Sequence, residues 1–343
     1  MRADNKPPRM TDIARVVGVS PMTVSRAFRN DGTVSQKTRD AVMSAAEGMG
    51  YVFDSTAAAL RLQRTGFVAV IIPSINNANF SDTLRGLTDG LKGQGLQILL
   101  GYTDYDIQKE EDLIEQLLRR RPEAIVVTGG THTPRARKLL SGAGIPVVEM
   151  WDLPKAPICH VVGFSNAAAM GGLVDHCVEA GLSRIAFIGG DINRDTRGAD
   201  RRHGFVAAMR RYGMDADRLV GLGHPPVSMR EGAEAMAQLL DTRPDTQAVI
   251  CVSDLAAFGA LTECQRRGIN VPGKIWIAGF GNYEVAGVCV PTLTTVDPLP
   301  NEIGHQVAVL VGRALTGVLD GTKTISIAHQ LVLRQSTAVA PTM

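Results

Sequence analysis

The sequence has little of what metal sites and disulfide frameworks are built from. Its 343 residues include five cysteines, which are odd in number and scattered over positions 159, 177, 251, 264 and 289. Metal sites bring their ligands together at short, recurrent spacings, and these cysteines show no such spacing. We therefore expect reduced thiols in a cytoplasmic protein, and neither a metal nor a resident cofactor.

Long apolar runs are missing as well. A membrane-spanning helix needs about 20 consecutive, predominantly apolar residues, and no stretch of this chain approaches that length. The first nine residues are polar and contain proline, so they lack the apolar run of a signal peptide. We expect no association with a membrane, and a flexible basic arm at the N-terminus.

The motifs of common enzyme classes are also absent. Gly279 and Gly281 lack the third glycine and the following helix of a dinucleotide fingerprint, and the sequence contains no P-loop. Ser253 and Asp254 adjoin each other, but nothing places a histidine base beside a nucleophile. We therefore expect no catalytic residues and a protein that binds its ligands without converting them.

The composition that is present is that of an ordinary globular protein. The chain is 45% hydrophobic and 20% charged, and it is long enough for two or three domains. Its net charge of +2 conceals an asymmetry, because residues 1–64 carry ten basic and six acidic side chains while the remainder carries 26 and 28. A basic head on a mildly acidic body is typical of a protein that binds nucleic acid through its head alone.

Residues 11–26 have the pattern of a helix, a tight turn and a second helix. Gly18 can adopt the positive φ that often follows a helix end. Ser20 is a favourable N-cap, and Pro21 suits the first helical position because its missing N–H costs nothing there. The pattern predicts a helix-turn-helix, whose second helix enters the major groove of DNA. The alternative is an ordinary helical hairpin.

Further motifs follow this pattern in a recognisable order. T-D-I-A begins at Thr11, G-V-S at Gly18, T-V-S-R at Thr23, V-S-x-x-T-R at Val34 and G-Y at Gly50. In this order and spacing they resemble the lactose/galactose-repressor family of bacterial transcription regulators. The family implies a homodimer on a near-palindromic operator in double-stranded DNA. The resemblance and the outward face of the second helix together predict DNA contacts from Ser20, Pro21, Met22, Thr23, Ser25, Arg26, Arg29, Thr38, Ala57 and Leu60.

These residues are expected to differ in what they contact. Arg26 offers a bidentate fork to O6 and N7 of guanine, Met22 offers only apolar contact, and the hydroxyls suit phosphates, which position the head without reading sequence. The resemblance places Leu60 in a hinge helix as a wedge in the minor groove; the alternative is simple interdomain packing. Phe53 and Asp54 depart from the family's usual Pro-Asn, which affects how the hinge docks.

From residue 67 onward, apolar runs alternate with helical patterns. This alternation predicts a doubly wound α/β architecture in two lobes, the first ending near residue 160, with a ligand site in the cleft between them. Strands are expected at 67–73, 97–101, 124–128, 146–149, 160–163, 184–189, 248–252, 275–279 and near 325–333. Helices are expected at about 80–93, 108–120, 134–142, 167–180, 198–212, 229–240, 255–267 and 300–316.

The resemblance continues to the end of the chain. V-G-F-S-N from Val162, V-S-D-L-A from Val252 and I-A-G-F from Ile277 match the family, whose members carry an effector domain like that of the periplasmic binding proteins. The expected fold is therefore an all-α helix-turn-helix head followed by a two-lobed α/β effector domain with doubly wound parallel sheets. The expected domains are a head with its arm over 1–51, a hinge and linker over 52–65, and an effector-binding and dimerisation domain over 66–343.

Three more stretches are similar to the gluconate-operon repressors within the family. These are T-H-T-P-R from Thr131, A-G-I-P-V-V-E from Ala143 and E-C-Q-R-R-G from Glu263. The resemblance implies a repressor of sugar-acid genes, associated with the nucleoid and released by a small effector such as gluconate. The residues predicted to bind the effector are Ser74, Phe80, His132, Asp152, Arg201, Ser253 and Asn282.

Arg201 is central to that set, because a guanidinium pairs a carboxylate bidentately. Arg197 and Arg202 are the alternatives to it, and the alternative for His132 is a surface position at a helix start. Asp254 is expected to cap a helix rather than to bind ligand. Other readings are a family member that answers to another sugar or to a phosphorylated metabolite, an activator, and a free solute-binding protein. A dimer is favoured over a tetramer, because no heptad-bearing tail follows residue 337.

Overall fold

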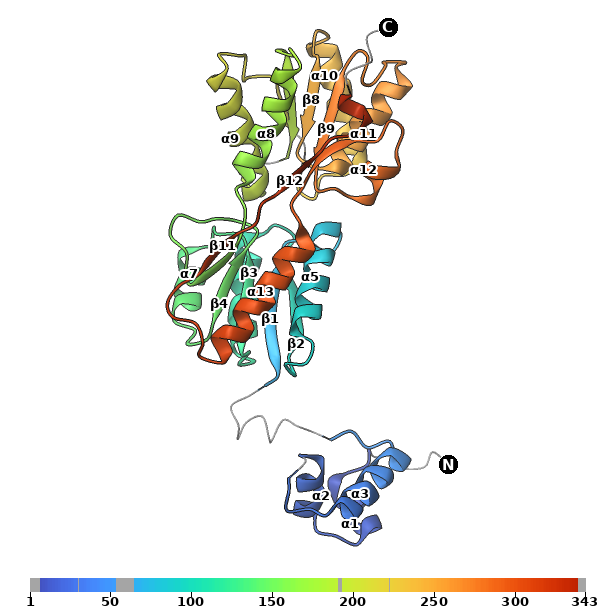
Figure 1. Ribbon diagram of the computed structural model, residues 1–343, viewed down its shortest axis with the longest axis vertical. Coiled ribbons are helices and arrows are strands. Elements are labelled where there is room, and N and C mark those ends of the chain that lie inside the picture. The colour runs from blue at the N-terminus through green and yellow to red at the C-terminus, as the bar shows by residue number, and fades with distance from the viewer. Residues whose placement is uncertain (1–6, 30, 54–64, 191–192, 222, 339–343) are drawn as a thin grey trace. The chain divides into compact units, whose positions relative to one another are not determined.

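The computed structural model describes residues 7–29, 31–53, 65–190, 193–221 and 223–338 (Figure 1). The chain divides into two units, Met1–Thr65 and Gly66–Met343. In the described part of the chain, no helix combines the length and the apolar character that crossing a membrane requires.

The N-terminal unit is a helix-turn-helix followed by a third helix. Its helices are α1 (Met10–Val17), α2 (Pro21–Phe28) and α3 (Gln36–Met49). Gly18 ends α1 with a φ of 74°, and the Ser20 side chain caps α2 by accepting the backbone N–H of Thr23 over 3.1 Å. Ile13, Val24 and Val42 contribute one fully buried side chain from each helix to a shared core. The predicted helix-turn-helix is thus confirmed.

The first lobe of the C-terminal unit is built on a sheet of six strands in the order β11-β5-β4-β3-β1-β2, all parallel. The strands are β1 (Phe67–Ile72), β2 (Gln97–Tyr102), β3 (Ala124–Thr128), β4 (Val147–Met150), β5 (His160–Gly163) and β11 (Thr324–Ser326). The helices of this lobe are α5 (Ala78–Leu91), α6 (Ile107–Leu118), α7 (Pro134–Ser141) and α13 (Pro300–Leu315).

The second lobe repeats the plan with the strand order β12-β10-β9-β8-β6-β7. Its strands are β6 (Ile185–Gly189), β7 (Leu219–Gly221), β8 (Ala248–Cys251), β9 (Trp276–Phe280), β10 (Thr294–Asp297) and β12 (Gln330–Val332). Its helices are α8 (Asn166–Glu179), α9 (Thr196–Arg211), α10 (Met229–Thr242), α11 (Asp254–Arg266) and α12 (Glu284–Val288), followed by a 3-10 turn at Gln335–Thr337. The two-lobed α/β fold is confirmed, except that β12 runs antiparallel to β10.

The chain leaves the first lobe after β5, near residue 160 as predicted, but the lobe is not complete at that point. The chain returns to that lobe after β10, because α13 packs against α5, and β11 then pairs with β5. The strand expected near 325–333 is two strands that belong to different sheets, β11 and β12 (Figure 1). The described chain therefore crosses between the lobes three times, after β5, after β10 and after β11.

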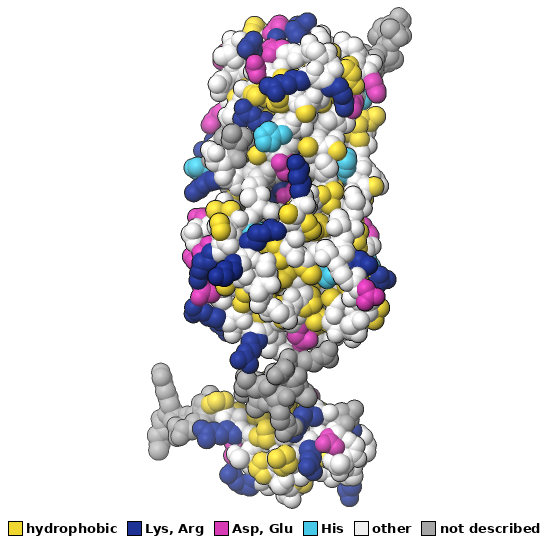
Figure 2. All heavy atoms as spheres, turned by 90° about the vertical axis from the view of Figure 1, so that its left-hand side faces the viewer, with side chains coloured by type: hydrophobic (Ala, Val, Ile, Leu, Met, Phe, Trp, Pro, Cys, Tyr) yellow, Lys and Arg dark blue, Asp and Glu magenta, His cyan; other side chains and the backbone are white. Residues whose placement is uncertain are grey.

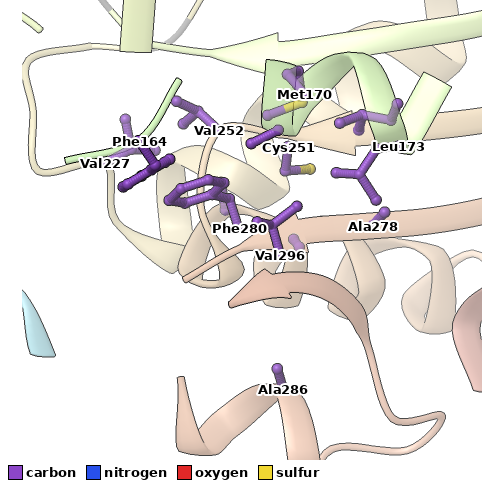
Figure 3. Packing of buried hydrophobic residues seen from close by; sticks show 14 of the residues in the cluster. Phe164, Met170, Leu173, Val227, Cys251, Val252, Ala278, Phe280, Ala286 and Val296 are labelled. Atoms are coloured by element: carbon purple, nitrogen blue, oxygen red, sulfur yellow. The ribbon is translucent and has the colours of Figure 1, made fainter. Parts of the chain in front are cut away.

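Both lobes have central strands that are buried on both faces. Every residue of β3 and β6 is buried, as expected for strands with helices on both faces. One cluster of buried side chains extends through both lobes, and Figure 3 shows its residues Phe164 and Phe280 beside Val252 and Val227. This cluster supports the side chains of the site described next.

Candidate functional site

The exposed face of α2 is the first candidate site. Pro21, Met22 and Arg26 are exposed, with 57% of Met22 accessible, while Val24 and Ala27 are buried on the opposite face. Figure 2 shows several Lys and Arg side chains on the visible face of the N-terminal unit, with few acidic ones. The helix therefore presents its N-terminal residues and an exposed arginine, which is the arrangement that suits the major groove.

Two hydroxyl pairs begin α2 and α3 in the same way. Ser20 Oγ lies 2.9 Å from Thr23 Oγ1, and Ser35 Oγ lies 2.9 Å from Thr38 Oγ1. Each serine also accepts the backbone N–H of its threonine, so the hydroxyls are fixed by helix capping. The predicted contacts Ser20, Thr23 and Thr38 thus belong to rigid helix starts, where phosphate oxygens also find free backbone N–H groups.

Ser25 and Arg29 lie differently from the expectation that both face DNA freely. Arg29 donates from Nε to the Ser25 carbonyl over 3.1 Å and from Nη2 to Ser25 Oγ over 2.8 Å. The two residues hold each other on a half-buried part of α2, while Arg26 remains exposed. The predicted hinge residues Ala57 and Leu60, and the unusual Asp54, lie outside the described residues.

The second candidate site is a pocket between the two lobes of the C-terminal unit. Its volume is about 600 Å³, counting the part that is open to solvent. The first lobe contributes Asn76, Asn77, Asn79, Phe80, Tyr105 and Trp151, and residues 195–283 contribute Asp195, Arg197, Arg201, Pro225, Pro226, Val227, Val252, Ser253, Leu255, Phe280 and Tyr283.

Three aromatic rings that line this pocket, Phe80, Trp151 and Phe280, belong to one row of packed rings, in which Phe164 lies behind the lining. The centroid of Phe80 lies 5.3 Å from that of Trp151, Trp151 lies 5.9 Å from Phe164, and Phe164 stacks on Phe280 at 6.0 Å. Trp151 Nε1 donates to Thr83 Oγ1 over 3.2 Å, which satisfies its one polar atom. The row runs from one lobe to the other, and its three lining rings present apolar surface to a ligand.

Arg201 is fixed in the pocket by three contacts. Its Nε donates to Asn166 Oδ1 over 3.0 Å, and its Nη1 donates to the Val252 carbonyl over 3.0 Å. Its Cζ lies 3.6 Å from the centre of the Phe280 ring, which is a close cation–π contact. Burial lowers the pKa of the Arg201 guanidinium, and the nearby Asp195 carboxylate opposes that change.

Arg197 comes from the preceding turn of α9 and points toward the other lobe. Its Cζ lies 5.8 Å from the centre of the Phe80 ring, and only 5% of the residue is exposed. Asp152 of the first lobe accepts a hydrogen bond from Asn166 Nδ2 over 3.2 Å. Burial raises the pKa of Asp152, while the positive charge of Arg197 lowers it. The pocket therefore holds two arginines, which could receive an anionic ligand.

A hydrogen bond joins the lobes at the edge of this pocket. Tyr283 Oη donates to Asn77 Oδ1 over 2.8 Å, and the same oxygen accepts the Asn79 backbone N–H at the start of α5. Asp254 fixes Tyr283 from behind, because one carboxylate oxygen accepts the Tyr283 backbone N–H over 2.7 Å. Asp254 is fully buried, and burial raises its pKa to about 6.

The structure brings three of the seven predicted effector residues into the pocket lining, namely Phe80, Arg201 and Ser253. Ser253 also caps α11, because its side chain accepts the Ala256 N–H over 3.3 Å. The prediction that Asp254 caps this helix is therefore wrong. Ser74 is buried behind the lining, where its Oγ accepts the Asn76 N–H. Asp152 lies beside Arg197.

His132 and Asn282 are not among the residues that line the pocket. The His132 ring is fully buried, with Nδ1 3.0 Å from Glu110 and Nε2 3.5 Å from Glu149. Burial opposes protonation of this ring, but the two carboxylates prevail and raise its pKa to about 9. Asn282 donates to Asp297 over 2.8 Å and accepts from Arg334 over 2.7 Å. Both predicted ligands therefore serve the internal structure of their lobes.

Several lining residues were missed by the sequence analysis, above all Asn77, Asn79, Tyr105 and Tyr283. A signal existed for the first two, because the polar run Asn76-Asn77-Ala78-Asn79 comes soon after the apolar strand at 67–72, and ligands bind at the carboxyl ends of parallel strands. Tyr105 has a φ of 59° in a loop and carries no comparable signal. Among the described residues, no cluster of three side chains could hold a metal ion.

A helix-turn-helix unit joined to a two-lobed unit with a pocket between its lobes defines a DNA-binding regulator of the ligand-responsive class. Residues 9–54 match the model of bacterial regulatory proteins of the lacI family, and residues 174–337 match that of a periplasmic binding protein-like domain. The chain is 34% identical over 330 residues to the HTH-type transcriptional regulator GntR of Pseudomonas aeruginosa, covering 96% of each chain. It belongs to the lacI family of bacterial transcriptional regulators.

Solved structures agree with this assignment. A LacI family regulator from Silicibacter pomeroyi has a TM-score of 0.90 at 33% identity over 96% of this chain and 99% of that one. The regulator GntR from Chromobacterium violaceum has a TM-score of 0.73 at 34% identity, over 79% and 99%. The Lac repressor dimer bound to operator and the anti-inducer ONPF shares the fold, with a TM-score of 0.84 at 20% identity over 97% and 100%. These relatives are regulators, which supports the expectation that the chain is not an enzyme.

Proposed function

We propose that the protein is a dimeric repressor of sugar-acid metabolism that leaves its operator when an acid such as gluconate binds between the lobes. The observation that carries this proposal is the presence of two arginines of one helix, Arg197 and Arg201, in a single pocket. Arginine is the side chain best suited to a carboxylate. The asparagine side chains of the pocket and Ser253 add hydrogen-bonding groups for the hydroxyls of a sugar acid.

The row of aromatic rings and the polar rim also suit such a ligand. A sugar acid exposes C–H groups that can pack against Phe80 and Phe280, while its hydroxyls face Asn77 and Tyr283. The stretches that resemble gluconate-operon repressors support gluconate over a neutral sugar. The effector is the only small molecule that this proposal requires, and the protein acts in the cytoplasm on the nucleoid.

Release of the operator follows from differential binding. A ligand that contacts both lobes stabilises one arrangement of the lobes over others, and it shifts the population by the difference between its affinities for them. Any effect on operator affinity must be reciprocal, so operator DNA should weaken effector binding by the same factor. The dimer is proposed from the shared fold with the Lac repressor dimer.

The test is fluorescence anisotropy of the full-length protein on labelled DNA from its own upstream region, at one fixed salt concentration. The complex is titrated separately with gluconate, 6-phosphogluconate and 2-ketogluconate, with sodium chloride as the ionic-strength control. Release by one of these acids at concentrations where sodium chloride has no effect supports the proposal. Tight binding to the DNA that none of the three acids reverses would discard the sugar acid as the effector.

A further inference from the structure

Arg197 is almost completely buried, and the Asp152 carboxylate beside it interacts with its charge without forming an ion pair. Only 5% of the residue is exposed, and within the described part of the chain it makes no hydrogen bond or ion pair. The Phe80 ring, Gly129 and Asp152 lie around its guanidinium. A guanidinium that lines a pocket and has no acceptor among the described residues has its N–H groups available for an anionic ligand. The position is therefore prepared for an anion.

The local structure keeps this guanidinium accessible to a ligand. Gly129 has a φ of 98°, and a Cβ added to it would lie 3.0 Å from Arg197 Nη1 and 3.8 Å from an Asp152 carboxylate oxygen. Glycine at this position leaves the space that the guanidinium occupies. The Asp152 carboxylate and the Arg197 guanidinium do not form an ion pair, so a ligand does not have to break one before it reaches the arginine.

Arg201 is in the opposite situation. Two of its nitrogens already donate to Asn166 and to the Val252 carbonyl, and its plane lies on Phe280. A bidentate pair with a carboxylate or phosphate needs two neighbouring N–H groups. Both pairs of neighbouring N–H groups on Arg197 are without an acceptor among the described residues. On Arg201, each pair includes a nitrogen that already donates a hydrogen bond. The geometry therefore separates a free arginine from one that is fixed by the protein.

Arg197 and Tyr105 also line a second cavity next to the pocket. This cavity lies at the start of α9, with Arg194, Thr196 and three further threonines on its walls, at positions 103, 128 and 131. Two acidic residues line it as well, but each is engaged: Asp106 caps α6, and Glu110 binds His132. Hydroxyls, a second arginine and a helix N-terminus are the groups that bind anions in proteins.

We propose that Arg197 is the anion receptor of the effector site, and that the charged end of the effector lies in the second cavity while its hydroxyl-bearing part lies in the pocket between the lobes. This inference deepens the proposed function and rests on it, because it assigns the effector to anionic ligands with a carboxylate or phosphate at one end. Arg201 is then a positioning residue that fixes Asn166 and the end of β8.

The test is isothermal titration calorimetry of the full-length protein with gluconate, 6-phosphogluconate and neutral D-glucose. Arg197→Gln removes the charge and keeps a polar side chain, and Arg202→Gln is the matched control, because Arg202 lines neither cavity. We expect Arg197→Gln to lower the affinity for the tighter-binding acid at least about 30-fold, since the loss of a buried charge partner is costly. Arg202→Gln should bind like wild type. Whether gluconate or 6-phosphogluconate binds more tightly identifies the charged group as carboxylate or phosphate.

A second pair of measurements separates a lost contact from a damaged fold. Arg197→Lys keeps the charge without the fork, and it should recover part of the affinity for the acid. Thermal unfolding with inorganic phosphate, against sodium chloride of equal ionic strength, should show a phosphate-dependent rise in Tm for wild type that Arg197→Gln lacks. Unchanged acid affinity in Arg197→Gln, or an equal loss for glucose and acid, overturns the assignment.

The outcomes also distinguish this inference from the proposed function. If gluconate releases operator DNA from Arg197→Gln as readily as from wild type, the anion receptor is wrong and the repressor mechanism stands. If no sugar acid releases the DNA while phosphate still stabilises wild type and not Arg197→Gln, the anion site stands and the proposed effector is wrong.

Discussion

The hydroxyl of Tyr283 in the second lobe donates a hydrogen bond to Asn77 in the first, with 2.8 Å between Oη and Oδ1. Both residues line the pocket between the lobes. The bond can exist only while the lobes keep this separation, so it contributes to the stability of this arrangement over any more open one. Burial raises the pKa of the Tyr283 phenol, which therefore stays a donor at all physiological pH values.

Tyr283→Phe removes this bond and leaves the ring in place. A hydrogen bond of this kind contributes about 1 kcal/mol, so we expect the affinity for the releasing sugar acid to fall about fivefold. The measurement is calorimetric titration of both proteins. Tyr212→Phe is the control, because the Tyr212 hydroxyl bonds Asp175 on the surface. Equal effector affinity in Tyr283→Phe and wild type would mean that the bond does not favour the binding-competent arrangement.

Arg26→Ala should relax operator specificity at a single base pair. Arg26 is the exposed arginine on the predicted reading face of α2, and a bidentate contact to guanine contributes about 1–3 kcal/mol of discrimination. The measurement is competition between the operator and variants with one substituted guanine per half-site. Arg15→Ala, which removes an exposed arginine paired with Asp12 on α1, should leave the ranking of the variants unchanged. A uniform loss over all variants would assign Arg26 to phosphate instead.

Arg201→Ala should abolish the response to the effector and preserve the binding of operator DNA. The substitution removes the donors to Asn166 and Val252 and the contact with Phe280, all inside the C-terminal unit. The anisotropy titration described above measures both properties on one sample. Release by ligand at the wild-type concentration would show that Arg201 has no part in the effector site.

The N-terminal unit could be predicted from sequence because its signals are local. Gly18, Ser20 and Pro21 each act on a neighbouring residue, and the structure shows the turn and the cap where those residue types predict them. Its exposed and buried residues on α2 follow from helical spacing alone. The bonds between Ser25 and Arg29 were not predicted, because a pair four residues apart on one helix can bond to each other as well as to DNA.

The effector unit could be predicted only in outline, because its decisive contacts join distant segments. Nothing near residue 300 indicates that α13 packs on α5, since that follows from a return of the chain to the first lobe. The bond between Asn77 and Tyr283 joins residues 206 positions apart. His132 precedes a helix start as expected, with Thr133 as the cap, but its burial between two carboxylates depends on β4 and α6.

A matched pair of glycine substitutions tests the contact between α5 and α13. A Cβ on Gly86 would lie 2.1 Å from the backbone oxygen of Asn301, whereas a Cβ on Gly172 in α8 meets nothing within 4 Å. We expect Gly86→Ala to lower the free energy of unfolding by about 1–3 kcal/mol through overpacking. Gly172→Ala should raise it by about 0.5–1 kcal/mol, since alanine is the better helix former. Urea unfolding of the three proteins measures both, and stabilisation by Gly86→Ala would contradict the close approach.

The buried histidine makes the stability of the first lobe depend on pH. The carboxylates of Glu110 and Glu149 raise the folded-state pKa of His132 to about 9 from its ordinary value of 6.5. A raised folded pKa means that the folded state binds the proton more tightly than the unfolded chain does. The stabilisation is therefore complete below pH 6.5 and is lost as the pH rises through about 9.

His132→Leu should reveal this dependence directly. At pH 6.5 the substitution leaves Glu110 and Glu149 buried without their cation, so we expect the free energy of unfolding to fall by about 3 kcal/mol or more. At pH 9.5 the wild-type ring has itself lost its proton, and the difference between the two proteins should shrink. Urea unfolding at both pH values measures it, with His203→Leu on the exposed face of α9 as the control. A difference that stays constant between the two pH values would show that His132 is neutral in the folded protein and acts through packing alone.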